Sequence, residues 1–178
     1  MNGKHFGNFG HKSHNIMQNT FTKMRLILLL LFFFQTAAVA QPKIVKLKEV
    51  EKILKSPSDQ IQVVNFWATW CGPCIKEMPL FESLEKQRSD VKVTLVSLDL
   101  DLDANPEKVF KFVERKGIQS TVLILDETDP NSWINKIDKS WSGSLPATIV
   151  VNTKTGKRKF VGRELKEGEL ETLIDSVK

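Results

Sequence analysis

Histidine is absent from most of this 178-residue sequence. Its three histidines, His5, His11 and His14, lie near the amino terminus, and no histidine follows them. Imidazole is the side chain that most often serves as a general base or metal ligand near neutral pH. Catalytic and metal-binding classes that depend on histidine are therefore excluded for the rest of the chain.

Cysteine is equally scarce, because Cys71 and Cys74 are the only two in the sequence. A structural zinc site normally takes four cysteine or histidine ligands, and a copper carrier would need the missing histidine, so we expect no metal. A disulfide that closes so short a loop contributes little to stability. A structural cystine and a pair of inert buried thiols are the weaker alternatives. The spacing favours a pair that is oxidised and reduced in turn.

Residues 1–40 have the pattern of a secretory signal. Leu26–Phe34 is a run of nine apolar residues, two basic residues precede it closely, and the small residues of Ala38–Ala40 follow it. A charged start, an apolar core and a small-residue cleavage site occur in this order in signal peptides. We predict cleavage after Ala40, which leaves 41–178 as one domain.

Two features of this leader stay open. A membrane span normally needs about 20 apolar residues, so an uncleaved membrane anchor is the weaker alternative. Translation from Met17 or Met24 instead of Met1 would shorten the polar stretch before the apolar run. In each case we expect a periplasmic or other extracytoplasmic location, where cysteines can persist as disulfides.

The positive charge of the sequence belongs mostly to the leader. The formal net charge is +5, and residues 1–40 hold four basic residues and no acidic one. The remaining chain carries 22 basic and 21 acidic residues, which is close to neutral. We therefore expect no nucleic-acid partner, because nucleic-acid-binding surfaces are strongly basic.

Strand-like and helix-like patterns alternate along residues 41–178. The expected strands are Ile44–Leu47, Ile61–Trp67, Val91–Leu100, Thr121–Leu125, Ala147–Val151 and Arg158–Val161. The expected helices are Lys48–Lys55, the stretch from CGPC to Gln87, Pro106–Lys116, Ser132–Ile137 and Glu167–Val177. This alternation predicts an α/β fold with a parallel core sheet and helices on both faces. The last two strands form an antiparallel hairpin, which makes the sheet mixed.

The two cysteines lie where a buried strand passes into a helix. Pro73 suits the first helical turn, because its missing N–H would be unpaired there anyway. Cys71 then lies at the helix amino terminus, where free N–H groups and the helix dipole favour a thiolate. Cys74 is three residues further on and so lies on the same side of the helix. Gly72 leaves the approach to Cys71 open.

The segment Asn65–Cys74, NFWATWCGPC, resembles the active-site stretch of the thioredoxin superfamily. Its continuation Ile75–Pro79, with a glutamate three residues after the second cysteine, resembles the exported TlpA/ResA-type branch. Ser144–Thr148, followed by an apolar strand, is similar to the loop that carries a cis-proline in that family. The resemblance covers roughly residues 44–178 and implies a thioredoxin-like fold.

The resemblance also implies a role for each residue of the site. Cys71 attacks a disulfide in a partner protein, Cys74 resolves the mixed disulfide, and Glu77 takes the proton of Cys74. A solvated Glu77 without a catalytic role is the alternative. The substrate-binding residues that the resemblance implies are Trp70, Gly72, Pro73, Leu145 and the cis-proline Pro146.

Two departures from the family limit these implications. Cytoplasmic thioredoxins have a buried aspartate where this sequence has Asn65, so proton transfer at that position is not expected. The segment Ile44–Asp59 is also shorter than the usual extension of the TlpA type. Trp133 and Trp141 have no role in the resemblance and are expected only to pack.

We therefore expect an exported thiol–disulfide oxidoreductase that reduces disulfides in other exported proteins. The resemblance implies apocytochrome c maturation as one setting, and a membrane thiol carrier of the DsbD/CcdA kind as electron donor. We expect a monomer that works without a cofactor. One alternative is an oxidant or isomerase that uses the same cysteines. Another is a non-catalytic module that binds peptides.

Overall fold

The computed structural model describes residues 3, 39–127 and 129–178. The apolar run of the predicted signal lies outside these described residues. Ala40 lies within them, and its N–H donates to the Ile118 carbonyl oxygen at 2.7 Å. The contacts of the folded body therefore include the residue before the predicted boundary at 41. No helix of the described part is long and apolar enough to cross a membrane.

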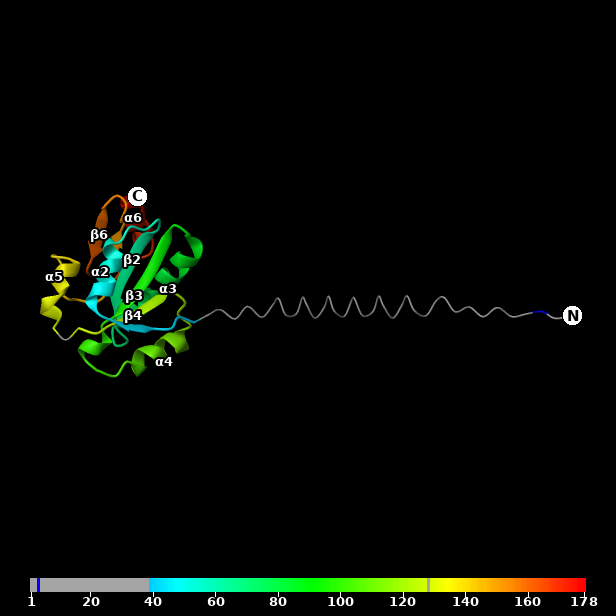
Figure 1. The fold of residues 1–178 in the computed structure, drawn as a ribbon, viewed down its shortest axis with the longest axis horizontal. Coiled ribbons are helices and arrows are strands. Elements are labelled where there is room, and N and C mark those ends of the chain that lie inside the picture. Colours follow the sequence, from blue (N-terminus) through cyan, green and yellow to red (C-terminus); the bar gives the residue numbers. More distant parts are fainter. Residues whose placement is uncertain (1–2, 4–38, 128) are drawn as a thin grey trace. The chain divides into compact units, whose positions relative to one another are not determined.

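Six strands form one mixed sheet in the order β1-β4-β3-β2-β5-β6 (Figure 1). The strands are β1 (Lys43–Val45), β2 (Ile61–Trp67), β3 (Val91–Ser97), β4 (Thr121–Leu125), β5 (Ala147–Val151) and β6 (Arg158–Val161). β2 pairs in parallel with β3 and antiparallel with β5, and every one of its residues is buried. The strand that leads to the cysteines is therefore enclosed along its whole length.

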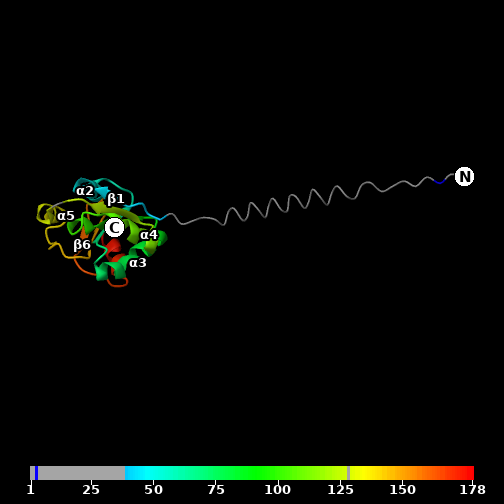
Figure 2. The same ribbon diagram turned by 90° about the horizontal axis from the view of Figure 1, so that it is seen from below.

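Helices cover both faces of the sheet. They are α2 (Leu47–Lys55), α3 (Gly72–Gln87), α4 (Glu107–Lys116), α5 (Ile134–Ile137) and α6 (Glu169–Ser176), with the short 3-10 helices η1 (Asp99–Asp101) and η2 (Pro130–Ser132). Figure 2 shows α2 on one side of the sheet and α3 on the other. Trp67 packs in the core beside α3, α4 and α6, whereas Phe66 packs in the core beside α2 and α5. Successive residues of β2 thus serve two separate cores, because strand side chains alternate between faces.

The two outer strands of the sheet are short. β1 has three residues and β6 has four. Arg158 and Lys159 of β6 are exposed. The Arg158 guanidinium donates to the Ile137 carbonyl oxygen at 2.5 Å and to the Asp138 carboxylate at 3.1 Å. β6 is thereby tied to the end of α5.

The expected α/β fold, with a parallel core and an antiparallel hairpin, is confirmed. Each of four strands was marked in the sequence by apolar residues or by an adjoining turn. These four have the predicted bounds: Ile61–Trp67, Thr121–Leu125, Ala147–Val151 and Arg158–Val161. Trp133 and Trp141 are buried, as expected for packing residues, and Trp67 is buried as well.

Other boundaries were wrong for identifiable reasons. β3 ends at Ser97 and not at Leu100, because the Asp99 carboxylate accepts a hydrogen bond from the Ser97 hydroxyl and the chain turns into η1. The final helix begins after Gly168, whose φ of 79° is left-handed. The expected helix Ser132–Ile137 is instead two short pieces, η2 and α5, separated by Trp133. The first strand ends at Val45, and α2 begins at Leu47, earlier than expected.

Candidate redox site

Cys71 and Cys74 form a disulfide at the start of α3. Their Cα atoms are 5.3 Å apart, and Cys71 is the N-cap residue of the helix. The Cys74 N–H donates to the Cys71 sulfur over 3.3 Å. Cys71 is 6% exposed and Cys74 only 1%, so Cys71 is the more accessible residue of the pair.

The backbone around this disulfide is held on both sides. The Cys71 N–H donates to the Ala68 carbonyl oxygen at 3.1 Å, and the Cys71 carbonyl accepts from Ile75 at 3.1 Å. Pro73 lies in the first helical turn, as predicted. A Cβ atom added to Gly72 would meet nothing within 4 Å. The glycine is therefore not required by neighbouring atoms, and its lack of a side chain matters only to a molecule that approaches from outside.

A buried aspartate fixes the loop before Cys71. Asp99 is 3% exposed, and its carboxylate accepts hydrogen bonds from the Thr69 N–H at 2.9 Å, from the Thr69 hydroxyl and from the Ser97 hydroxyl at 2.7 Å. Trp70, which follows Thr69, is 56% exposed. Sequence reasoning missed Asp99, although an acidic residue just after a buried strand was a usable signal. The contact holds an exposed indole next to the disulfide.

Glu77 lies on the buried side of the disulfide helix, and each of its carboxylate oxygens accepts a hydrogen bond. It is 2% exposed, so the alternative of a solvated Glu77 is wrong. One carboxylate oxygen accepts from the Asn65 amide at 2.8 Å, and the other accepts from the Leu165 N–H at 2.8 Å. The Asn65 amide also donates to the Thr148 hydroxyl at 3.0 Å. One acidic side chain of α3 thereby contacts β2 and the loop after β6, and reaches β5 through Asn65.

Burial raises the pKa of Glu77 above its ordinary value, because an ion loses its hydration there. The hydrogen bonds from Leu165 and Asn65 favour the ionised form and offset part of this rise, while the nearby Glu164 charge adds to it. Both partners of the carboxylate are N–H donors. Glu77 therefore has two donors for its ionised form, and burial still raises its pKa above the ordinary value.

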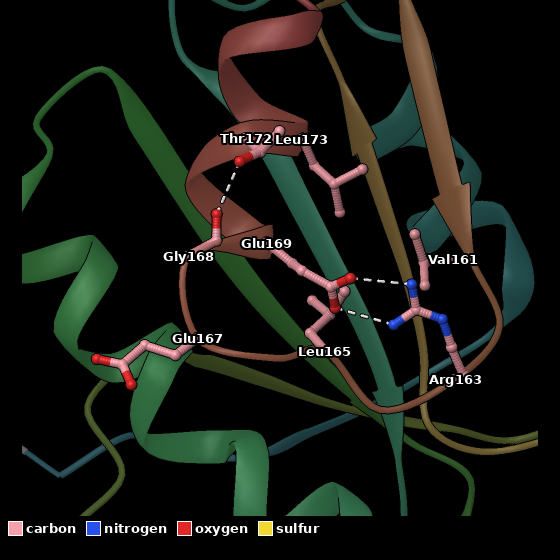
Figure 3. Close-up of a pocket in the computed structure, with 8 residues that line it drawn as sticks. All are labelled: Val161, Arg163, Leu165, Glu167, Gly168, Glu169, Thr172 and Leu173. Carbon is pink, nitrogen blue, oxygen red and sulfur yellow. Dashed lines mark hydrogen bonds and ion pairs between the residues drawn. The ribbon is translucent and has the colours of Figure 1, made fainter.

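The loop that holds Glu77 is anchored by charges (Figure 3). Leu165 is 3% exposed and belongs to the core of the α3 face. Lys76 pairs with Glu164 at 2.9 Å, and Arg163 donates to both carboxylate oxygens of Glu169 at 2.9 and 3.0 Å. The Arg163 guanidinium holds the pKa of Glu169 well below its usual range. These contacts fix the backbone N–H that faces Glu77.

The same loop borders a hollow of about 400 Å³ between β6 and α6. Of its three charged lining residues, Arg163 and Glu169 are engaged with each other, whereas the Glu167 carboxylate points away from this pair (Figure 3). The Thr172 hydroxyl donates to the Gly168 carbonyl oxygen at 2.8 Å. The hollow therefore offers few free polar groups to a ligand. Across residues 39–127 and 129–178, no three histidine, cysteine or acidic side chains gather as a metal site would require.

The predicted substrate-binding residues follow β2 or precede β5 in the chain. The Leu145–Pro146 bond is cis, as the resemblance implied. Ala147 pairs with Phe66 across the antiparallel ladder, so Pro146 lies at the same end of the sheet as Trp67 and the disulfide helix. Leu145 is half-buried and packs against both cores. Gly72 and Pro73 are exposed, as is Trp70.

Comparison with known proteins agrees with this geometry. The thioredoxin family pattern matches residues 41–131. A thioredoxin of Mycolicibacterium smegmatis is 46% identical over 64 residues, which are 36% of this chain and 55% of the relative. The thiol-disulfide oxidoreductase ResA of Bacillus cereus is 32% identical over 117 residues, which are 64% of this chain and 61% of the relative. The matches thus span about half to three-fifths of these relatives' length.

Solved structures share the fold. A thioredoxin-related protein from Neisseria meningitidis serogroup B superposes with a TM-score of 0.58 at 26% identity, covering 68% of this chain and 87% of that one. A DsbF homologue from Corynebacterium diphtheriae gives a TM-score of 0.54 at 23% identity, covering 67% and 73%. The predicted thioredoxin-like fold is confirmed, and the ResA relatives agree with the predicted branch.

The raised pKa of Glu77 predicts a specific pH dependence of stability. A carboxyl that holds its proton more tightly when folded contributes stability that is full below its unfolded pKa and is lost as pH rises through its folded pKa. In Glu77→Gln this loss disappears, so wild type should lose stability relative to the variant as pH rises above the ordinary glutamate range. Urea unfolding of both proteins at a series of pH values measures the difference.

Glu169→Gln is the matched control for this experiment. The folded-state pKa of Glu169 is lowered, so its contribution is lost as pH falls, which is the opposite slope. The quantity compared is the free energy of unfolding of wild type minus that of Glu77→Gln. If this difference did not change with pH, or if it rose with pH as expected for Glu169, a raised pKa at Glu77 would be contradicted.

Proposed function

The chain belongs to the thioredoxin family, and from this premise we propose that it is a thiol–disulfide oxidoreductase whose reacting atoms are the sulfurs of Cys71 and Cys74. The observation that carries this proposal is the placement of the cysteines. The more accessible one, Cys71, caps a helix. The less accessible one, Cys74, lies three residues further along that helix and three residues before the buried carboxylate of Glu77. The names of the ResA relatives support the same reaction type.

In the reduced protein, Cys71 is the attacking group. Free N–H groups of the first helical turn and the helix dipole stabilise its thiolate, and the Cys74 N–H already faces its sulfur. The thiolate attacks one sulfur of a partner disulfide, so that bond breaks, a mixed disulfide forms and a partner thiolate leaves. Trp70, Gly72 and Pro73 form the exposed surface around this step, where they contact the partner.

Cys74 completes the reaction. It loses its proton to Glu77, and its thiolate attacks the Cys71 sulfur, which releases the second partner thiolate. Both partner thiolates gain protons from solvent or from Glu77. Two electrons have then passed from the cysteine pair to the partner, and the disulfide seen in the structure has formed. Burial raises the pKa of Glu77, which makes this carboxylate a stronger base than an exposed one.

We propose that the substrates are disulfides in exported proteins and that the protein works outside the cytoplasm. Leu145 and Pro146 receive the substrate chain beside the disulfide. Reduction of further substrate requires an external thiol donor, for which a membrane thiol carrier is the candidate. Apocytochrome c is one candidate substrate, and a monomer suffices for this chemistry. An oxidant or isomerase with the same cysteines is the second candidate, because the same exchange steps run in either direction.

Cysteine substitutions test the assignment of the two sulfurs. Cys71→Ser should abolish reduction of insulin disulfides, whereas Cys74→Ser should attack and remain trapped as a mixed disulfide, detected by mass spectrometry. Trapping by Cys71→Ser instead would reverse the two roles. If wild type does not reduce insulin but Cys71→Ser still binds its peptides, the protein is a binding module.

Replacement of Glu77 tests the proton acceptor. Glu77→Gln should leave the first attack unchanged and slow resolution of the mixed disulfide by on the order of a hundredfold, as expected on loss of a positioned base. Rapid-quench analysis of the mixed disulfide separates the two steps. Glu85→Gln, which removes an acid of the same helix that pairs with Lys92, is the control. Equal resolution rates in Glu77→Gln and wild type would exclude Glu77 as the acceptor.

The reduction potential decides the direction of the reaction. A reductant should equilibrate with glutathione or dithiothreitol buffers near the thioredoxin value of about −270 mV. A potential near about −120 mV, as in DsbA, would contradict the reductant and support the oxidant.

A further inference from the structure

The segment between α5 and β5 carries the residues that the proposed function assigns to the substrate chain. Its backbone passes through Ser142, Gly143 and Ser144 before the Leu145–Pro146 bond. Ser142 and Ser144 are exposed, and none of these residues belongs to a helix or strand. A loop of this kind needs side-chain contacts to present its backbone in one orientation.

The main contact from the interior comes from Trp141. This side chain is 3% exposed, and its indole N–H donates to the Ser144 carbonyl oxygen at 2.9 Å. The acceptor is the peptide group that joins Ser144 to Leu145. Its orientation therefore helps to fix the plane of the backbone just before the cis-proline.

Three other rings hold the indole itself. The Trp141 ring lies 4.7 Å from Phe66, 5.6 Å from Trp133 and 6.0 Å from Phe160, measured between centroids. Phe66 is the residue of β2 that pairs with Ala147. The indole is thus packed against the strand that leads to the cysteines. Its hydrogen bond to Ser144 therefore holds the loop in a fixed position relative to that strand.

Trp133 and Trp67 provide a contrast. Both indole nitrogens are buried, and neither has a hydrogen-bond partner among the described residues. Their rings are used for packing alone, although Trp133 lies in the same aromatic cluster as Trp141. The hydrogen bond of Trp141 is therefore a feature of that residue and not a general consequence of placing tryptophan in this core.

Two further contacts constrain the same loop. Gly143 has a φ of 86°, and a Cβ atom there would lie 2.9 Å from the Ile134 Cδ1. The Ser144 hydroxyl donates to the Gly162 carbonyl oxygen at 3.3 Å, which is long for such a bond. The indole hydrogen bond is shorter and partly buried, whereas the hydroxyl bond is exposed, so the indole is the stronger constraint on this part of the loop.

We propose that Trp141 is a positioning residue for polypeptide substrates. Its indole N–H holds the Ser144–Leu145 peptide group so that the Leu145 backbone is preorganised to meet an extended substrate chain beside the disulfide. Small disulfides without a peptide chain do not use this surface and react at Cys71 without it. This inference rests on the proposed function, and it adds a specificity for disulfides within polypeptide segments.

Trp141→Phe tests the inference, with Trp133→Phe as its matched control. Both changes shorten a buried indole to a phenyl ring in one cluster, and only the first removes a used N–H. For Trp141→Phe we expect KM for insulin reduction to rise roughly three- to tenfold, which matches loss of one net hydrogen bond, with kcat retained. The rate of the reduced variant with 5,5′-dithiobis(2-nitrobenzoic acid) should stay within about twofold of wild type. Trp133→Phe should change neither parameter.

The inference would be overturned if Trp141→Phe lost activity equally with insulin and with 5,5′-dithiobis(2-nitrobenzoic acid). It would also be overturned if Trp141→Phe and Trp133→Phe behaved alike. Thermal unfolding of both oxidised variants shows whether either has lost its fold. Hydrogen exchange supplies a readout apart from activity: amides of the segment 142–148 should exchange faster in Trp141→Phe and not in Trp133→Phe. Unchanged exchange in Trp141→Phe would also overturn it.

The exchange measurement separates this inference from the proposed function. If wild type reduces no insulin and does not cycle, the proposed function fails, and the substrate role of Trp141 fails with it. Faster exchange in Trp141→Phe alone would then still assign the loop contact to the indole. If wild type is active and exchange is unchanged, the inference fails while the proposed function stands.

Discussion

The contact on which the site depends is the hydrogen-bonded burial of Glu77. A carboxylate removed from water is costly unless N–H donors replace its hydration. Here Asn65 and Leu165 each supply one donor at 2.8 Å. The two donors come from β2 and from the loop after β6, and Asn65 reaches β5 through Thr148. Three parts of the chain must therefore be in place before α3 can hold its acidic residue inside, and the same helix carries both cysteines.

The two faces of the sheet contribute to the site in different ways. The α3 face supplies the groups proposed to react, because Cys71, Cys74 and Glu77 all belong to that helix or cap it. The opposite face supplies support, because the aromatic cluster around Trp141 contacts the loop that precedes β5. β2 connects the two, with Phe66 in one core and Trp67 in the other. Substrate positioning and chemistry can therefore be altered separately by substitutions in different cores.

Much of this arrangement was readable from the sequence, where the signal was local. The largely apolar segment Ile61–Trp67 predicted a buried strand, and the CGPC segment predicted a helix start with Cys71 at its amino terminus. The contacts that were missed join residues far apart in the chain. Asp99 lies 30 positions from Thr69, and Leu165 lies 88 positions from Glu77. The sequence around Asp99 or Leu165 does not indicate which distant residue it contacts. Trp141 was expected only to pack, because its ring is visible in the sequence but the acceptor for its N–H is not.

The short outer strands have a consequence for how the sheet edges meet other polypeptide chains. An open sheet edge can recruit any extended polypeptide by backbone pairing, and short, charged edges discourage it. β6 has four residues, two of them basic, and Arg158 is engaged by the end of α5. β1 has only three residues. Unspecific strand addition at the sides of the sheet is thus disfavoured, and the sheet is protected from the aggregation that would accompany it.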